Sequence, residues 1–303
     1  MVFENDKRRL IMIDFTDLPH TKRAYNGANG KKLAVIYNEN TYMLKFPNLS
    51  RLNDNMSYAN DCFSEYIGCH IFKTLGFEVQ ETLLGVYRTN NKENIVVACK
   101  DFCVNGFNLQ DFGSIKNTII ESHYNGYETD LENIISTINN QRLFDSTILT
   151  TKFWDMFIVD SLIGNSNRHN GNWGFLYNQD SDEIKLAPIY DCGSCLFPES
   201  DETIMKGVID NQTERDLRIF DIPLSAIKIN GNNIRYFDFI SSLSNEDCNK
   251  ALLRIVPKIN LDAINTIIEE TPFATSLQKE FYKTILSDRK TRILDFSYDK
   301  LTK

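Results

Sequence analysis

The stretch Gly164-Asn165-Ser166-Asn167-Arg168-His169-Asn170-Gly171-Asn172 is the densest cluster of polar side chains in the sequence. It follows an apolar, helix-like segment over residues 146–163 and precedes a run of strand-forming residues at 173–177. A loop between a helix and a strand is free to direct its side chains into a cleft. Nineteen residues after Asn172, a second predicted strand ends at Asp191-Cys192-Gly193. The two loops together indicate a site of amide and carboxylate oxygens, which are ligands that Mg²⁺ prefers.

The spacing within these loops matches that of protein kinases. Asn167 and Asn172 are five residues apart, as are the catalytic-loop Asp and the Mg²⁺-binding Asn of kinases. Asp191-Cys192-Gly193 has the form of their metal-binding Asp-Phe-Gly, with Cys in place of Phe. Lys45 falls in a predicted strand and Glu65 on the following helix, where kinases carry the phosphate-binding lysine and its ion-pair partner. Each element alone is weak, but their shared order predicts phosphoryl transfer.

The remaining pattern predicts two unequal halves. Runs of β-branched and aromatic residues lie at 10–15, 33–37, 41–46, 82–87 and 95–102, with one amphipathic helix over 63–74 among them. From about Gly106 the pattern is mostly helical, and beyond Asp201 it predicts several helices separated by prolines. We therefore expect an α+β, bilobal protein-kinase-like fold. A strand-rich N-lobe over 1–105 is followed by a mainly helical C-lobe over 106–303, with a cleft between them.

Composition excludes several classes of protein. The chain has 303 residues, 42% of them hydrophobic, which is typical of a globular protein. A net charge of −8 and a pI near 5.2 argue against direct binding of nucleic acid. Seven scattered cysteines do not form a disulfide framework and favour a reducing compartment. No segment has the pattern of a secretory signal or a membrane span, so we expect a cytoplasmic protein without a membrane partner, although non-classical export would leave no mark.

Other motifs are weaker. Cys192 and Cys195, with Cys99 and Cys103, have an irregular spacing for a zinc site. Gly27-Ala28-Asn29-Gly30-Lys31-Lys32 is not a Walker A loop, because Lys32 stands where Ser or Thr would bind Mg²⁺. Only its place ahead of the predicted Lys45 strand makes it a candidate phosphate loop.

Several of these segments resemble one known family. Residues 164–173 resemble the Gly-Asn-x-Asp-Arg-His-x-x-Asn signature of the HipA-like serine/threonine kinases. Ala187-Pro188-Ile189-Tyr190-Asp191 resembles the family's metal-binding strand end, Tyr42-Met43-Leu44-Lys45-Phe46-Pro47 its phosphate-lysine strand, and Ser64-Glu65-Tyr66 its helix glutamate. The likeness runs from about Gly27 to the C-terminus and is closest to compact members that lack an extra N-terminal subdomain.

The resemblance implies a set of roles. It implies ATP and Mg²⁺ as cofactors, a protein carrying Ser or Thr as substrate, autophosphorylation, and an antitoxin-like partner of a toxin system. Asn172 and Asp191 would bind the metal, and His169 stands beside the catalytic position, where we favour a hydrogen-bonding anchor over an acid–base role. The nucleotide-binding residues that it implies are Gly27, Ala28, Asn29, Gly30, Lys31, Lys45, Glu65, Lys100, Asp101 and Phe102.

One departure from the family concerns the catalytic position itself. The family has Asp where this sequence has Asn167, and an amide is not basic enough to accept the proton of a substrate hydroxyl. Nucleotide binding is expected to be retained despite this change, because Lys45, Asn172 and Asp191 are present. Two origins fit: a deliberate inactivating substitution, or a natural pseudokinase. The functional hypotheses are accordingly an impaired kinase, a nucleotide-binding pseudokinase, and an interacting toxin-system subunit with a vestigial cleft.

Overall fold

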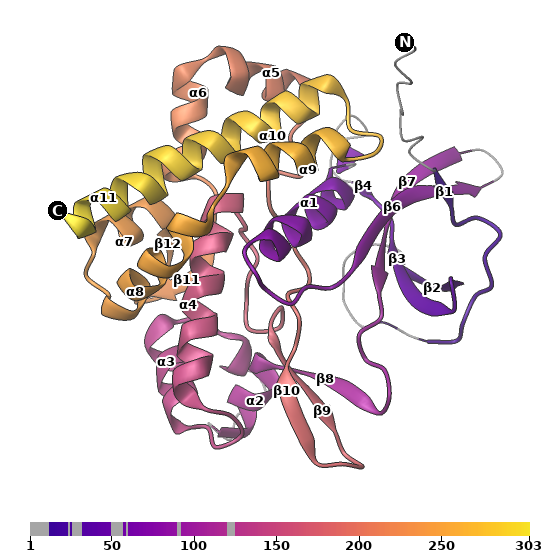
Figure 1. The fold of residues 1–303 in the computed structure, drawn as a ribbon, viewed down its shortest axis with the longest axis horizontal. Coiled ribbons are helices and arrows are strands. Elements are labelled where there is room, and N and C mark those ends of the chain that lie inside the picture. Colours follow the sequence, from indigo (N-terminus) through magenta and orange to yellow (C-terminus); the bar gives the residue numbers. More distant parts are fainter. Residues whose placement is uncertain are drawn as a thin grey trace, which may run out of the picture.

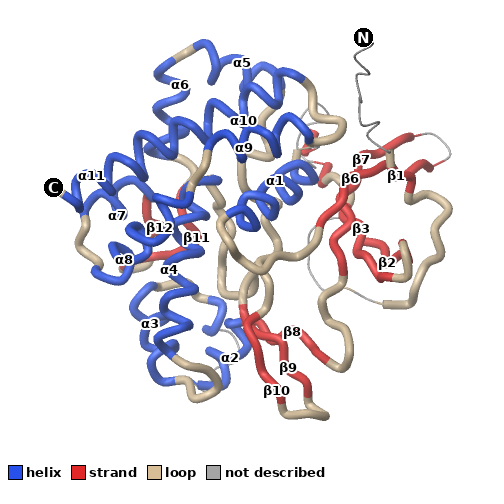
Figure 2. Tube along the Cα trace, in the orientation of Figure 1, coloured by secondary structure: helices blue, strands red, loops and turns tan. Residues whose placement is uncertain are grey.

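The computed structural model describes residues 12–23, 25, 32–49, 57–58, 60–89, 92–119 and 125–303. A strand-rich region, which contains the N-terminal sheet, lies beside a larger helical region that ends at the C-terminus (Figure 1). Figure 2 shows the same division by secondary structure, with a second, smaller group of strands below the helices. The predicted kinase-like α+β class is confirmed.

A five-stranded sheet forms the strand-rich region. Its spatial order is β1-β6-β7-β3-β2, and β1 is parallel to β6 whereas the other neighbours are antiparallel. The strands are β1 (Ile13–Asp14), β2 (Lys32–Tyr37), β3 (Asn40–Lys45), β6 (Thr82–Thr89) and β7 (Lys92–Lys100). Two further short strands, β4 (Asn48–Leu49) and β5 (Ser57–Tyr58), pair with each other.

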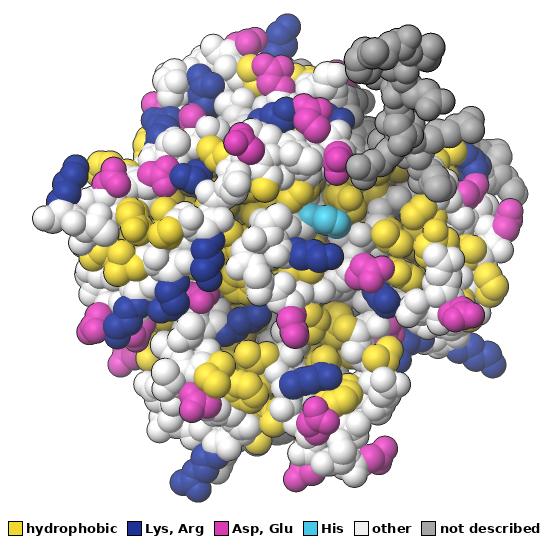
Figure 3. Space-filling model, viewed as in Figure 1, with side chains coloured by type: hydrophobic (Ala, Val, Ile, Leu, Met, Phe, Trp, Pro, Cys, Tyr) yellow, Lys and Arg dark blue, Asp and Glu magenta, His cyan; other side chains and the backbone are white. Residues whose placement is uncertain are grey.

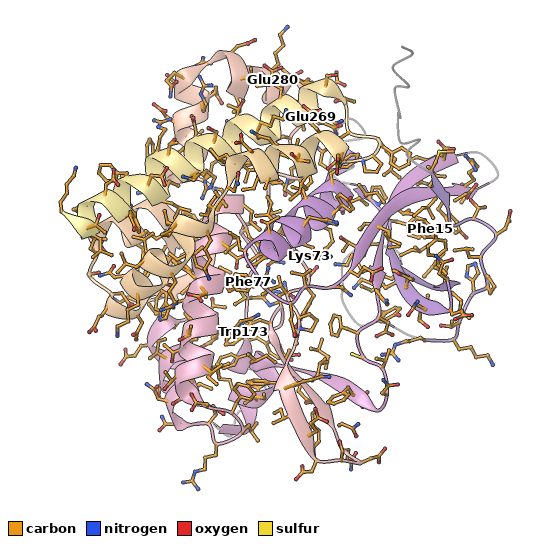
Figure 4. The ribbon with its side chains drawn as sticks, in the orientation of Figure 1. Phe15, Lys73, Phe77, Trp173, Glu269 and Glu280 are labelled. Atoms are coloured by element: carbon orange, nitrogen blue, oxygen red, sulfur yellow. The ribbon has the colours of Figure 1, made fainter. Side chains whose placement is uncertain are left out.

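Alternation of side chains gives this sheet two different faces. On one face Tyr42 and Leu44 of β3 pack with Phe15, which Figure 4 labels among the strands, in a small apolar core. The opposite face of β3 carries Met43 and Lys45, which line a cleft. The predicted strand at 41–46 is therefore confirmed, and its pleat separates core residues from candidate site residues.

The β2–β3 hairpin is closed by a two-residue turn. Asn38 and Glu39 both have positive φ, 45° and 64°, which is the backbone of a type I′ turn. This turn sets the register of the two strands, and it places Lys32 directly opposite Lys45. The hairpin link predicted at 38–40 is confirmed.

The helical region is built around α4 (Ser146–Ile163), whose bounds agree with the prediction. Eleven of its eighteen residues are buried, so it is the central helix of this region. Helices α8 (Glu246–Ile255) and α10 (Ser276–Arg289) pack on it, and α9 (Leu261–Glu270) packs against α1 (Asp61–Thr74) beside the sheet. The other helices are α2 (Phe112–Ile119), α3 (Leu131–Asn140), α5 (Glu202–Asp210), α6 (Gln212–Asp216), α7 (Tyr236–Ser242) and α11 (Phe296–Thr302).

One strand and one hairpin in this region were not predicted. The three-stranded sheet β10-β9-β8 contains the expected β9 (Gly174–Asn178) and β10 (Glu183–Leu186), but β8 (Phe107–Asp111) lies where the pattern indicated helix. Similarly, β11 (Leu224–Ile229) and β12 (Asn232–Arg235) form a hairpin within a stretch read as helical. Its turn is Asn230-Gly231, both with positive φ, and this dipeptide is itself a strong hairpin signal.

The large core joins both regions. Trp173 lies between α4 and the β8–β10 sheet (Figure 4), with its ring stacked on Phe112 at 4.1 Å between centroids.

All seven cysteines are free thiols. Among the described residues, none of the helices combines the length and the apolar character that crossing a membrane requires.

Candidate active site

Lys45 lies between two carboxylates from distant parts of the chain. Its Nζ is 2.7 Å from Glu65 Oε2 on α1 and 2.8 Å from Asp191 Oδ1 in the loop after β10. Burial lowers the pKa of Lys45, but Asp191 and Glu65 outweigh this and hold that pKa well above its ordinary value. The structure thus brings together three residues that the sequence predicts for one site, Lys45 and Glu65 as an ion pair and Asp191 as a metal ligand.

Glu65 has a second contact in this cluster. Its Oε1 accepts a hydrogen bond of 2.9 Å from the backbone N–H of Cys192, and its side chain is 1% exposed. The sequence left open that Glu65 is simply a solvated surface residue, and the structure shows that it is not. One carboxylate therefore fixes both the lysine and the loop that carries Asp191.

Asp191 occupies an unusual backbone conformation. Its φ is 56°, in the left-handed region that Asp tolerates better than most residues. The Lys45 ammonium lowers the pKa of its carboxyl to about 2, so Asp191 is ionised at neutral pH. Just before it, Ile189 exchanges hydrogen bonds of 2.8 Å with Glu78 and Gln80, which anchors the loop to the segment after α1.

The loop that carries Asn167 begins at the end of α4. Gly164 ends the helix in the left-handed conformation, with φ 63°. Asn165 then donates from Nδ2 to Asp160 Oδ1 at 2.9 Å and accepts the Asn167 N–H on Oδ1 at 3.1 Å. Asn167 itself lines the cleft. The loop is therefore held by its own side chains before any ligand binds.

Arg168 is the buried centre of this loop. Its guanidinium pairs with Asp160 at 3.0 Å and donates to the backbone carbonyls of Asn172 and Tyr190, at 2.8 and 2.6 Å. Burial raises the pKa of Asp160, although Arg168 opposes this. Asn172 is one candidate metal ligand, and Tyr190 directly precedes the other, Asp191. Arg168 therefore holds both ligand positions in place.

His169 and Asn172 complete the loop. His169 Nδ1 accepts the Gly171 N–H at 3.0 Å, and burial lowers the pKa of its imidazole, so it stays neutral as a local anchor while lining the cleft. Asn172 donates from Nδ2 to the Asn167 carbonyl at 2.9 Å. This bond orients the amide and assigns its Oδ1 as the atom for a cation.

The segment after β7 also lines the cleft. Asp101 and Phe102 line it, whereas the Lys100 side chain contacts Glu81 at 3.3 Å and is not among the lining residues. Asp101 is held by an ion pair with Arg23 and by the Tyr25 hydroxyl at 3.1 Å. The sequence did not single out Arg23 or Tyr25, because nothing local links them to position 101.

The predicted phosphate loop lies outside the described residues, since Gly27, Ala28, Asn29, Gly30 and Lys31 are not among them. The cleft has a volume of about 1410 Å³. Lys32, which ends the candidate loop segment but is not among the nucleotide-binding residues that the resemblance implies, lines it next to Lys45. The signal that identifies Lys32 is the hairpin register: it precedes Asn38 by six residues, and Lys45 follows Glu39 by six.

The donor set fits the group that the sequence implies. A carboxylate at Asp191 and an oriented amide oxygen at Asn172 are hard oxygen ligands of the kind that bind Mg²⁺ with few protein contacts and with substrate phosphates. Lys45 supplies a cation for phosphates in the same cleft. The arrangement can hold a nucleotide polyphosphate with its metal.

Comparison with known proteins agrees with this geometry. Residues 23–267 match the family model described as HipA-like C-terminal domain. The chain is 46% identical over 290 residues to the serine/threonine-protein kinase CtkA of Helicobacter pylori strain J99, covering 95% of this chain and 88% of the relative.

Solved structures give the same result. The crystal structure of the Helicobacter pylori proinflammatory kinase CtkA superimposes with a TM-score of 0.90 at 45% identity, covering 96% of this chain and 98% of that one. HipA of Shewanella oneidensis MR-1, solved with HipB and operator DNA, has a TM-score of 0.58 at 16% identity, with 92% and 67% covered, and so shares the fold.

Proposed function

The chain belongs to the HipA-like serine/threonine kinase family, and from this premise we propose that it binds ATP with Mg²⁺ in the cleft. The cleft is built to pass the γ-phosphoryl group to a Ser or Thr hydroxyl of a protein. Asn167, at the catalytic position, makes that transfer strongly impaired. The observation that carries this proposal is the single Lys45 ammonium shared by Glu65 and Asp191.

Each residue has a defined part in this proposal. Lys45 binds phosphate oxygens, and Glu65 keeps its ammonium directed into the cleft. Asp191 and Asn172 would hold Mg²⁺, which, when bound, neutralises and orients the phosphates. Asp101 and Phe102, which line the cleft, would lie beside the base. Phosphoryl transfer is mainly a matter of positioning and charge, and these residues supply both.

Asn167 limits the reaction at the proton-transfer step. Its amide accepts a hydrogen bond from an acceptor hydroxyl but cannot take up the proton as a carboxylate would. Loss of a general base typically costs about 10²–10⁴-fold in rate. Because Asn165 and Asn172 hold the loop through the backbone of residue 167, the exchange of side chain leaves those bonds in place.

The test is to restore the acid. Asn167→Asp is expected to raise ³²P transfer from ATP, to the chain itself or to a generic protein, by about 10²–10⁴-fold, with ATP–Mg²⁺ affinity changed much less. The matched control is Asn167→Ala, which removes the amide without adding a base. If Asn167→Asp binds ATP–Mg²⁺ by calorimetry yet transfers no more phosphate than Asn167→Ala, the kinase proposal is wrong.

Asn167 also favours a second function, a nucleotide-binding pseudokinase that acts as an interaction module. In that case ATP–Mg²⁺ gives heat of binding in a calorimetric titration while Asn167→Asp gains no transferase activity. A calorimetric titration without heat of binding would contradict both functions. A cytoplasmic location and an antitoxin-like partner remain further proposals, and co-purification from the source cells tests them together.

We also propose the division into lobes at residues 1–105 and 106–303. The chain leaves the five-stranded sheet at Lys100 and enters the second sheet at Phe107, which supports a connection between lobes at 101–106. Hydrogen exchange of the full chain tests this division. Amide protection that differs between the two sides of the connection would support it, and equal protection on both sides would contradict it.

A further inference from the structure

Lys32 is a second lysine on the cleft face of the sheet. It opens β2 directly opposite Lys45 on β3, and residues opposite each other in an antiparallel pair point to the same side. Both side chains line the cleft. Lys32 is a different residue from Lys31, the loop lysine that the family resemblance implies.

Lys45 alone has few donors left for a nucleotide. An ammonium has three N–H groups, and contacts with Glu65 and Asp191 at 2.7 and 2.8 Å use two of them. One N–H remains for a phosphate oxygen while both contacts persist. A triphosphate carries several negative charges, so its neutralisation calls for a further cation beside Lys45.

Two other cations that line the cleft form ion pairs. Among the described residues that line it, Arg23 pairs with Asp101, in the segment assigned to the base. Arg218 pairs with Glu214 at 2.9 Å. Lys32 interacts electrostatically with Lys45, Asp191 and Glu65. It therefore belongs to the same charge cluster as the proposed phosphate site.

The environment of Lys32 suits an incoming anion. Burial, and then the neighbouring Lys45, lower the pKa of its ammonium, and Asp191 and Glu65 only partly oppose this. Two lysines side by side repel each other, and an anion bound between them relieves that repulsion. The charged pair is thus better satisfied with phosphates present than without them.

We propose that Lys32 is a second phosphate-contacting cation, which together with Lys45 makes the cleft selective for nucleoside polyphosphates over nucleosides. This deepens the proposed function and rests on it. Lys45 holds one part of the phosphate chain and is tied to Asp191, whereas Lys32 contacts the chain from the neighbouring strand.

Calorimetry on the full chain tests this, because binding does not require catalysis. Lys32→Met is expected to weaken ATP–Mg²⁺ binding by about 10- to 100-fold, the range for a lost hydrogen bond to a charged group, and to change adenosine binding less than twofold. Lys32→Arg, which keeps the charge, is expected to retain most of the affinity. The matched control is Lys92→Met, at the exposed far end of β7.

The outcomes separate the two proposals. Equal losses for ATP and adenosine would assign Lys32 a structural role and overturn the inference, as would ATP affinity within threefold of the unchanged chain. If Lys32→Met does not fold, Lys32→Gln at the same position gives the same comparison. If the unchanged chain binds no ATP–Mg²⁺, the proposed function is wrong and this inference with it. If the unchanged chain binds ATP–Mg²⁺ and Lys32→Met does not weaken that binding, only the inference is wrong.

Discussion

At the scale of single residues, the pKa of Asp191 is lowered mainly by one neighbour. The Lys45 ammonium at 2.8 Å lowers the pKa of the Asp191 carboxyl to about 2, below its ordinary value of 3.8. A carboxyl whose pKa is lower in the folded chain than in the unfolded chain favours folding only while it is ionised. Its contribution is complete above about pH 4 and is lost as the pH falls toward 2.

This predicts an acid-dependent difference between the chain and Asp191→Asn. Above pH 4 the unchanged chain is expected to have the higher free energy of unfolding. From pH 4 down to pH 2 the difference is expected to shrink, because protonation of Asp191 removes its charge. Urea midpoints at pH 6, 4, 3 and 2.5 measure it. The control is Asp180→Asn, an exposed carboxylate in the β9–β10 turn, and a pH-independent difference for Asp191→Asn would contradict the prediction.

Whether the sequence predicts a site residue depends on how that residue reaches its partners in the site. Lys45, Glu65 and Asp191 follow from their order along the chain, and the structure brings them together. Arg23 does not follow, because its pairing with Asp101 depends on the pairing of residues 19–21 with β2, which brings two distant segments together. Lys32 follows only once the turn at Asn38 fixes the hairpin register.

At the scale of elements, the end of α4 controls where the loop with Asn167 begins. Gly164 has φ 63°, and a Cβ there would lie 3.3 Å from Pro223 Cγ and 3.6 Å from Arg289 Cζ. A left-handed backbone costs a residue with a Cβ about 1–2 kcal/mol. The helix is therefore terminated by a position that only glycine occupies without strain.

Gly164→Ala is accordingly expected to lower the free energy of unfolding by about 1–2 kcal/mol, with a further loss if Pro223 does not move. The matched control is Gly207→Ala inside α5, where a Cβ meets nothing within 4 Å and the backbone is helical. That change is expected to stabilise by about 0.5–1 kcal/mol. Denaturant unfolding of both variants measures the contrast, and equal effects of the same sign would contradict it.

The accuracy of element prediction follows the strength of the local signal. The long apolar pattern of α4 gives its bounds, and its first turn is capped by Asp145, which accepts the Ile148 N–H at 2.9 Å. Strand β8 is short, and its pairing with β9, which begins more than sixty residues later, stabilises it. A short strand with distant pairing leaves little trace in its own residues.

At the scale of the whole molecule, charge is distributed rather than concentrated. On the face shown in Figure 3, acidic and basic side chains are interspersed over the surface. The net charge of −8 is therefore compatible with binding an anionic nucleotide, because the cations that meet it, Lys32 and Lys45, are gathered inside the cleft. Local placement of charge, which composition does not record, decides what the cleft binds.

The cleft also joins the two regions, and this gives the final prediction. Lys45 comes from the sheet, while Asn172 and Asp191 come from loops of the helical region, so a nucleotide that contacts all three binds only the folded chain. At a hundredfold excess over its dissociation constant such a ligand adds about 2.7 kcal/mol. For a chain of this size we expect ATP with Mg²⁺ to raise the unfolding temperature by roughly 5 °C in a thermal-shift experiment. Chelating the metal with EDTA is expected to remove most of the shift, and Lys45→Met to abolish it relative to its own baseline. A shift of equal size with ATP and Mg²⁺, with EDTA added, and in Lys45→Met would show that ATP stabilises the chain as a general polyanion outside the cleft. That result would contradict the assignment of Lys45, Asn172 and Asp191.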